Sequence, residues 1–485
     1  MSLDYKKIRQ GFASVVKVNL LDHQIDGVIW MRNMENSAFM GGVLADDMGL
    51  GKTLQMLVTM VLNGYHQTLV VCPLAVVQNW KREIKDRLDL PIKIAIYRGK
   101  SRHVMDLADY NIVITTYATL SLEPMDGQLM TNDWHRVVLD ESQMIKNHET
   151  KCARAVCNLE ATYRWCLSGT PVQNNLDELF STTKFLRIPN YSTKSDFDDS
   201  MEISSANELM KQISLRRTKD ILSLPRKRVH EYPCHMVKEE TNVYNAYMAQ
   251  VRRLCFMQRK AEEENSLEED TRPPSMASIL AKLTKLRQGC NHVKHLYGEK
   301  DHVPDWVSTH TSSKQEAIVK LVKKLVARKR QVIVFSYFLS MVNNLVQDLE
   351  TSSHTVKKYT GAMVHKKREQ VLEEFRNGNI QVLVMSTTCA NVGINLTQAS
   401  AVVLVEPWWN PFVDDQAMDR AHRIGQIRNV DVFKCFVPNT IDDRIMILQK
   451  VKRELVEDLW ADPTTTTTKK KQVGLTKKDI TFLLR

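Results

Sequence analysis

The feature that most constrains this chain is the run of residues 46–53, DDMGLGKT, which lies between an apolar segment and a stretch with helical apolar spacing. A strand, a glycine-rich turn ending in Gly-Lys-Thr and a helix together form an arrangement in which backbone N–H groups hold a polyphosphate. In it, Lys52 would neutralise the β- and γ-phosphates and the Thr53 hydroxyl would ligate Mg²⁺. The predicted loop consists of Asp46, Asp47, Met48, Gly49, Leu50, Gly51, Lys52 and Thr53, with Asp46 where the common pattern has its first glycine.

Length and composition set the broad class. A chain of 485 residues predicts two or three domains, and its formal charge of +11 favours a polyanionic partner. The nine cysteines form no C-x-x-C pair, which favours buried reduced thiols over a zinc site. The first residues carry no apolar signal core, and no apolar stretch reaches membrane-spanning length. These features predict a soluble intracellular protein.

Short β-rich runs alternate with helical stretches, which predicts parallel sheets covered by helices. One series of runs covers residues 43–45, 68–72, 112–115, 137–139 and 165–168, and a second covers residues 332–335, 382–385, 402–405 and 430–433. Between the two series, residues 189–301 read as helical. We therefore predict two α/β lobes, with domains at residues 1–224, 225–305 (a helical insertion), 306–460 and 461–485 (a low-complexity basic tail).

An apolar run at residues 137–139 ends in the paired carboxylates Asp140 and Glu141. At the carboxyl edge of a sheet beside the phosphate loop, Asp140 would hold Mg²⁺ through water and Glu141 would orient or deprotonate the attacking water. The hydroxyl-rich turn at residues 167–175 ends the next strand and would hydrogen-bond these carboxylates. An ordinary strand-to-loop turn is the alternative interpretation.

In the second lobe, residues 415–426 read DQAMDRAHRIGQ. On a helix, Gln416, Arg420 and Arg423 would share one face through i,i+4 and i,i+3 spacing. Two arginines there would reach phosphates bound on the other lobe, and an arginine finger contributes roughly 10³ to 10⁵ in rate. A solvated basic helix face is the alternative.

These motifs, in this order, resemble the Swi/Snf-type branch of the superfamily-two helicase-like ATPases, and the resemblance runs from about residue 20 to 443. Further matching blocks are LDHQ at 21–24 with Gly27 and Trp30, LVVCP at 69–73 with Asn79-Trp80, ITTY at 114–117, LRRTK at 215–219, LTKLRQGCNH at 283–292 and WWNP at 408–411. The resemblance implies two RecA-like parallel-sheet lobes with a helical insertion between them. It also implies that Gln24 reads adenine and that the cofactors are ATP and Mg²⁺.

The chain departs from the family pattern at three places. Gln143 stands where the family usually has histidine, and it keeps hydrogen-bonding capacity. Ala390 and Asn391 replace the usual glycine pair before Gly393, and Glu406 stands where aspartate is common. None of these changes removes Lys52, the carboxylate pair or Arg423, so an active ATPase is expected.

The resemblance implies a DNA-dependent ATPase that moves along duplex DNA by gripping its backbone and remodels or displaces bound proteins. The candidate DNA contacts are Thr116, Ser386, Thr387 and Trp409, with packing inside the second lobe as the alternative for Trp409. Expected partners are nucleosomes or the transcription machinery, and a nuclear monomer is expected. The compact form resembles baculoviral global transactivators, which would place it in a host nucleus. Two other functions stay open: a strand-separating helicase, and a nucleotide-gated DNA-binding regulator with weak ATPase activity.

Overall fold

The structure is a computed structural model of the chain, and its described part divides into two compact units. It describes residues 15–63, 66–99, 105–172, 176–191, 193–264, 275–299, 301–351, 355–389 and 394–460, with the single positions 11, 102, 482 and 483. Unit 1 comprises Met1–Leu224 with Glu454–Val473, and unit 2 comprises Pro225–Arg453 with Gly474–Arg485. Within the described chain, no helix is both long and apolar enough to cross a membrane.

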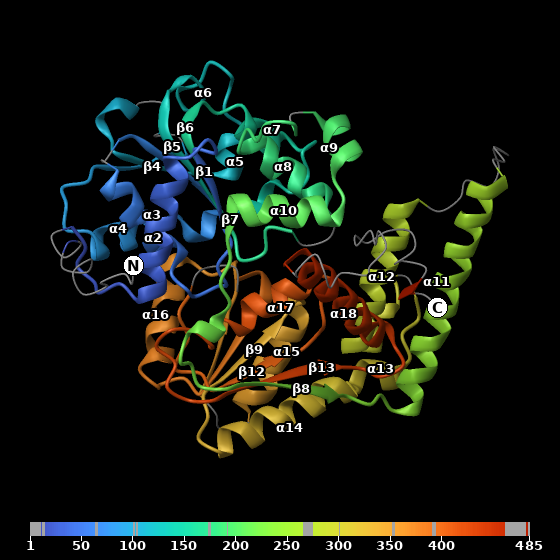
Figure 1. Cartoon of the computed structure of the whole chain (residues 1–485). Coiled ribbons are helices and arrows are strands. Elements are labelled where there is room, and N and C mark those ends of the chain that lie inside the picture. Colours follow the sequence, from blue (N-terminus) through green and yellow to red (C-terminus); the bar gives the residue numbers. More distant parts are fainter. Residues whose placement is uncertain are drawn as a thin grey trace. The chain divides into compact units, whose positions relative to one another are not determined.

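Unit 1 is built on a seven-stranded parallel sheet in the order β3-β4-β2-β5-β6-β1-β7. Figure 1 labels strands β1, β4, β5, β6 and β7 of this sheet. Its strands are β1 (Gly41–Leu44), β2 (Thr68–Cys72), β3 (Ile94–Ile96), β4 (Ile112–Thr116), β5 (Trp134–Asp140), β6 (Ala161–Leu167) and β7 (Ser214–Leu215). The central strands are buried on both faces, which is why they read as continuous apolar runs. The phosphate loop follows β1, near one edge of this sheet.

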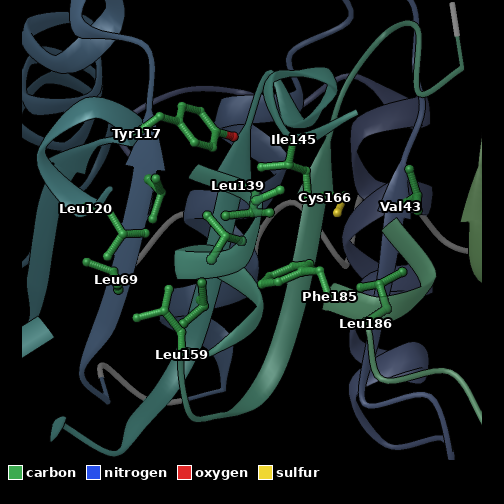
Figure 2. Close-up of a cluster of buried hydrophobic side chains, with 14 of the residues drawn as sticks. Val43, Leu69, Tyr117, Leu120, Leu139, Ile145, Leu159, Cys166, Phe185 and Leu186 are labelled. Atoms are coloured by element: carbon green, nitrogen blue, oxygen red, sulfur yellow. The ribbon is translucent and has the colours of Figure 1, made fainter. Parts of the chain in front are cut away.

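Helices cover both faces of the unit 1 sheet, because successive side chains of a strand point to opposite sides. Helices α2 (Asp22–Glu35), α3 (Lys52–Leu62) and α4 (Val77–Arg87) share one apolar core with alternate strand residues. The opposite core, shown in Figure 2, contains residues of α5 (Tyr117–Leu120), α6 (Gln128–Thr131), α7 (Lys151–Cys157), α8 (Asp177–Phe185), α9 (Lys194–Ser200) and α10 (Ile203–Ile213). The sheet thereby forms the middle of three layers.

Unit 2 has a six-stranded parallel sheet in the order β10-β11-β9-β12-β13-β8. Its strands are β8 (Lys227–Pro233), β9 (Val332–Ser336), β10 (Val356–Tyr359), β11 (Val382–Ser386), β12 (Ala401–Leu404) and β13 (Val430–Phe436). Helices α14 (Ser313–Ala327) and α15 (Leu339–Glu350) pack on one face, and α16 (His365–Arg376) and α17 (Pro411–Met418) on the other. A further core joins α11 (Lys238–Glu264), α12 (Met276–Asn291), α13 (Asp305–Thr309) and the start of α18 (Ile441–Trp460).

The predicted fold class is confirmed: there are two RecA-like parallel-sheet lobes, with a largely helical insertion between them in the sequence. Every strand predicted from the sequence is present, whereas β3, β7, β8 and β10 were not predicted. Strands β7 and β8 lie in the stretch that was expected to be helical, so that expectation was wrong there. Ala390, Asn391, the end of the turn at 173–175 and the tail at 463–471 lie outside the described residues.

A buried ion pair joins α2 to β5 inside unit 1. Arg136 donates from Nε to Glu35 Oε1 at 2.6 Å and from Nη2 to Oε2 at 2.8 Å, and both side chains are fully buried. The Trp165 indole also donates to Glu35 Oε1, at 2.9 Å. Half-buried Asn63 also donates from Nδ2 to Glu35 Oε2, so both carboxylate oxygens are satisfied by protein groups.

Removing the carboxylate of this pair should destabilise the fold strongly. We expect Glu35→Ala to lower the free energy of unfolding by about 3–5 kcal/mol, because it leaves the Arg136 charge buried without its partner. The control is Glu160→Ala, which breaks the exposed Glu160–Arg187 pair of the same 2.6 Å separation and should cost less than about 1 kcal/mol. Urea unfolding of both variants provides the comparison, and equal losses would contradict the prediction.

Candidate functional site

The phosphate loop leaves β1 and enters α3 at Lys52. Gly49 and Gly51 adopt positive φ values of 93° and 90°, which glycine tolerates without a side-chain clash. The Lys52 ammonium donates to the carbonyl oxygens of Asp46 at 2.6 Å and Asp47 at 3.4 Å, so it lies across the loop. Thr53 stands in the first turn of α3, where backbone N–H groups have no acceptor within the helix. The loop therefore has the backbone shape and the cation that a bound phosphate needs.

Gln24 lies against this loop. Its Nε2 donates to Leu50 O at 3.1 Å, and its Oε1 accepts from Leu21 N at 3.0 Å. A Cβ built on Gly51 would lie 2.4 Å from Gln24 Nε2, so the close approach requires glycine at that position. The structure thus brings Gln24 to the loop, and its contact with adenine stays a prediction.

Asp140 ends β5 and is held at three points. The Trp80 indole donates to Asp140 Oδ2 at 2.7 Å, the Glu141 N–H donates to Oδ1 at 3.0 Å, and the Tyr117 hydroxyl donates to the Asp140 carbonyl at 2.9 Å. Burial, followed by the neighbouring Glu141 charge, raises the pKa of Asp140 to about 6, against the lowering effect of the Trp80 bond. A nearby cation such as Mg²⁺ would favour the ionised form.

Glu141 adopts a left-handed backbone conformation, with φ 53° and ψ 54°. A non-glycine residue rarely adopts this conformation, and such strain clusters at functional sites. The Glu141 carboxylate accepts from Gln143 Nε2 at 2.6 Å, and Gln143 Oε1 accepts from the Ser168 hydroxyl at 2.7 Å. Ser168 Oγ in turn accepts from Thr170 N at 3.0 Å.

The turn after β6 is therefore connected to the carboxylates through Gln143, the residue that departs from the family pattern. A Cβ on Gly169 would lie 3.4 Å from Asp46 O and 3.6 Å from Lys52 Nζ, so this turn also borders the phosphate loop. The loop, the carboxylate pair and the turn form one continuous site in unit 1. The sequence predicted that the turn would bond the carboxylates, but it did not identify Gln143 as the connection.

Breaking this connection should slow hydrolysis. We expect Gln143→Ala to lower kcat by about ten- to a hundredfold, because a hydrogen bond to a charged group contributes about 1.5–3 kcal/mol. Gln143→His should stay within about tenfold of the original rate, since an imidazole nitrogen donates to the carboxylate equally well. Gln128→Ala, at an exposed position of α6, is the control. Steady-state ATP hydrolysis measures all three, and an unchanged Gln143→Ala rate would contradict the role.

Mg²⁺ fits the donors that the site offers. The Thr53 hydroxyl and the Asp140 carboxylate supply oxygen ligands, the type that Mg²⁺ prefers, and phosphates and water would complete its shell. Each Asp140 carboxylate oxygen accepts one hydrogen bond and keeps capacity for another contact. Among the described residues no cluster of three or more His, Cys, Asp or Glu could hold a metal ion.

The predicted arginine face of unit 2 differs from the expectation in one respect. Gln416 lies on α17, but that helix ends at Met418, so Arg420 and Arg423 follow it in a series of turns. Arg420 N donates to Ala417 O, three residues earlier, where an α-helix would use the carbonyl four residues earlier. The Arg420 carbonyl oxygen accepts from Leu396 N at 3.0 Å. The prediction that these three residues share one helical face was therefore wrong, because tertiary hydrogen bonds compete with the helix at this point. Arg420 is buried and Arg423 is half-buried.

The candidate DNA contacts lie deeper than expected. Thr116 caps α5 by accepting from Thr119 N at 3.1 Å, and Ser386 Oγ lies 2.7 Å from Thr388 Oγ1. Thr116, Ser386 and Thr387 are all at most 5% exposed, so a phosphate would meet their backbone groups more readily than their hydroxyls. Their contact with DNA stays a prediction.

Trp409 is half-buried in an aromatic group around Arg287. The Arg287 guanidinium lies 4.8 Å from the Trp409 ring centre and 4.4 Å from that of Trp408, and it donates to Pro407 O at 3.1 Å. The buried Arg287 cation is stabilised by the ring faces. This geometry supports the alternative interpretation of Trp409 as a packing residue, although it leaves part of the ring exposed.

Several residues of the site were not assigned a role from the sequence, namely Trp80, Tyr117 and Arg217. Each lies in a quoted sequence block, yet each acts through a contact with a residue far along the chain. Glu406, noted as a departure, accepts from Ser336 Oγ at 2.8 Å and from Tyr337 N at 3.0 Å. It therefore joins the end of β9 to the end of β12.

Two parallel-sheet units, one of which carries a phosphate loop beside paired carboxylates, define a helicase-like ATPase. The chain matches the SNF2-related domain over residues 23–295 and the helicase conserved C-terminal domain over residues 313–425. It belongs to the SNF2-related family, and ATP use follows from that membership.

The proteins to which this chain is similar include two curated relatives and one solved structure. The chain is 30% identical to a probable global transactivator of Orgyia pseudotsugata multicapsid polyhedrosis virus, with 91% of each chain covered. It is 27% identical to an uncharacterized ATP-dependent helicase of Schizosaccharomyces pombe, covering 93% of this chain but only 61% of that relative. The SWI2/SNF2 ATPase core of Sulfolobus solfataricus, solved in complex with dsDNA, is 31% identical with a TM-score of 0.43, and 92% of this chain and 93% of that one are covered.

Proposed function

We propose that this chain is a DNA-dependent ATPase that translocates along duplex DNA and displaces or remodels proteins bound to it. The observation that carries the proposal is the continuous site in unit 1, where hydrogen bonds connect Asp140, Glu141 and the turn at Ser168, and where that turn borders the phosphate loop at Gly169. Family membership and the charge of +11 support a polyanionic partner, such as duplex DNA, along which the chain would move.

Each residue of the site has a defined task in this mechanism. Lys52 and the loop N–H groups bind the phosphates, and Trp80 and Tyr117 hold Asp140 in place. Mg²⁺, held by Thr53 and Asp140 through water, would neutralise charge on the phosphates. Glu141 takes a proton from the attacking water.

Gln143 links Glu141 to the turn at Ser168, so a shift of that turn would change the position of Glu141, the proposed general base.

We further propose that Arg420 and Arg423 of unit 2 stabilise the charge that develops during hydrolysis. Thr116, Ser386, Thr387 and Trp409 remain the proposed DNA contacts, and the nucleus, of the cell or of an infected host, is the proposed location.

Steady-state ATP hydrolysis with no nucleic acid, duplex DNA, single-stranded DNA or RNA tests the proposal. We expect the largest stimulation from duplex DNA. Equal stimulation by single strands or RNA would instead favour a strand-separating helicase, and displacement of a strand from forked DNA would establish that alternative. No hydrolysis under any condition would leave only a nucleotide-gated DNA-binding regulator.

Movement along the duplex needs its own measurement. A triplex-forming strand bound to the duplex should be released in an ATP-dependent manner, while the two duplex strands stay paired. Release without ATP, or no release despite stimulated hydrolysis, would contradict translocation.

A further inference from the structure

The first residue of the phosphate loop has an unusual environment. The Asp46 side chain is 0% exposed, although a carboxylate is costly to bury without partners. Its backbone does not adopt a positive φ, so this position does not need the glycine of the common pattern. Whether another residue can replace Asp46 therefore depends on the contacts of its carboxylate.

Arg217 supplies most of those contacts, from 171 residues further along the chain. Its Nε donates to Asp46 Oδ1 at 2.9 Å and its Nη2 to Oδ2 at 2.5 Å, which is the two-point geometry of a strong arginine–carboxylate pair. Gln55 of α3 joins the pair: its Nε2 donates to Asp46 Oδ2 at 3.0 Å, and its Oε1 accepts from Arg217 Nη2 at 2.7 Å. Arg217 Nη1 also donates to the carbonyl of His23 in α2. Asp46 is thus fixed to α2, α3 and the segment after β7.

Gly27 of α2 gives independent support, because any side chain at this position would overlap the cluster. A Cβ built on Gly27 would lie 1.8 Å from Gln55 Oε1 and 2.8 Å from Arg217 Nη2. Glycine in the middle of a helix lowers helix stability, and here it lets two polar side chains meet beneath the loop. The contact between Gln55 and Arg217 therefore requires glycine at this position of α2.

The backbone near Arg217 is also joined to the loop. Ala45 N donates to Leu215 O at 2.8 Å and Asp47 N donates to Arg217 O at 2.9 Å, which extends the β1–β7 pairing into the phosphate loop. Lys219 N donates to Asp47 Oδ2 at 3.1 Å. Five residues after Lys219, the first of the two segments of unit 1 ends at Leu224. The segment that leaves the unit is therefore bonded directly to the loop.

We propose that Arg217 is a positioning residue that fixes the phosphate loop through Asp46, in place of a glycine-dependent turn at the first loop position. The inference rests on the proposed binding of ATP at this loop. It predicts that nucleotide affinity depends on the Asp46–Arg217–Gln55 cluster, although none of these three side chains need touch the nucleotide.

The test is direct binding of a fluorescent ADP analogue to the full chain, which requires neither hydrolysis nor DNA. We expect Arg217→Gln to weaken binding by about tenfold or more, because the loop loses a charge-assisted two-point anchor. The matched control is Arg154→Gln, which removes an exposed arginine of α7 in the same unit. This control should stay within about twofold of the original affinity.

Two further variants keep the test decisive if Arg217→Gln folds poorly. The double variant Asp46→Asn with Arg217→Gln removes both charges, so no unpaired charge stays buried, and it should still bind about tenfold more weakly. Gly27→Ala removes no charged group, and it should weaken binding by displacing Gln55 and Arg217. Thermal melting checks that each variant is folded.

The outcomes are separable. If the unaltered chain binds no ADP analogue, the proposed function itself fails. If it binds, and the folded double variant and Gly27→Ala bind with unchanged affinity, the inference about Arg217 is overturned while the proposed function stands. Equal weakening in Arg154→Gln would also overturn it, since the effect would then follow from the loss of any positive charge in the unit.

Discussion

Replacing Lys52 with alanine should lower ATP turnover by about 10²–10³-fold or more, because the variant loses the cation that faces the phosphates. In the structure the Lys52 ammonium donates hydrogen bonds to the carbonyl oxygens of Asp46 and Asp47, which phosphate oxygens would replace when nucleotide binds. Duplex DNA binding should be preserved, since the lysine is assigned to the proposed nucleotide site and not to the proposed DNA contacts. The measurements are steady-state hydrolysis and DNA binding without nucleotide.

Lys85→Ala, at an exposed position near the end of α4, is the control for loss of one positive charge from the same unit. It should leave hydrolysis unchanged. If Lys52→Ala loses DNA binding together with hydrolysis while Lys85→Ala does not, the separation between the nucleotide site and the DNA contacts is wrong.

Arg423→Ala should keep ATP affinity within several-fold and lose about 10³–10⁵ in the rate of hydrolysis. The reason is that an arginine finger acts on charge that develops during the reaction and contributes little to ground-state binding. Single-turnover hydrolysis, together with equilibrium nucleotide binding, separates the two effects.

The control for this variant is Arg428→Ala, in the same segment, where the exposed Arg428 donates to Gln398 O at 2.7 Å. Its removal should change hydrolysis less than about threefold. Near-normal turnover of Arg423→Ala would remove Arg423 from the mechanism and leave Arg420 as the remaining candidate.

The sheets could be predicted from the sequence because their inner strands are buried on both faces and are continuously apolar. Strands β2 and β11 are examples, with every residue buried. Strand β8 has no buried residue and a charged sequence, so no apolar pattern marks it. Strand β7 has two residues, and its backbone pairing with β1 is what makes it a strand.

The site was predictable where local sequence sets the chemistry, as in the glycine turns of the phosphate loop and the carboxylates that end β5. It was not predictable where a side chain finds its partner across the fold. Trp80 meets Asp140 at 60 residues' separation, and Arg217 meets Asp46 at 171. The end of α17 at Met418 belongs to the same class, because the competing hydrogen bond comes from Leu396.

The exposed strand β8 has a consequence for the behaviour of the protein in solution. Among the described strands it is the outermost of its sheet, and edge strands invite pairing between molecules. Here the edge carries Lys227, Arg228, His230 and Glu231 and closes with Pro233. Charges and proline on an edge oppose strand addition, so this strand protects the chain from aggregation while it completes the sheet.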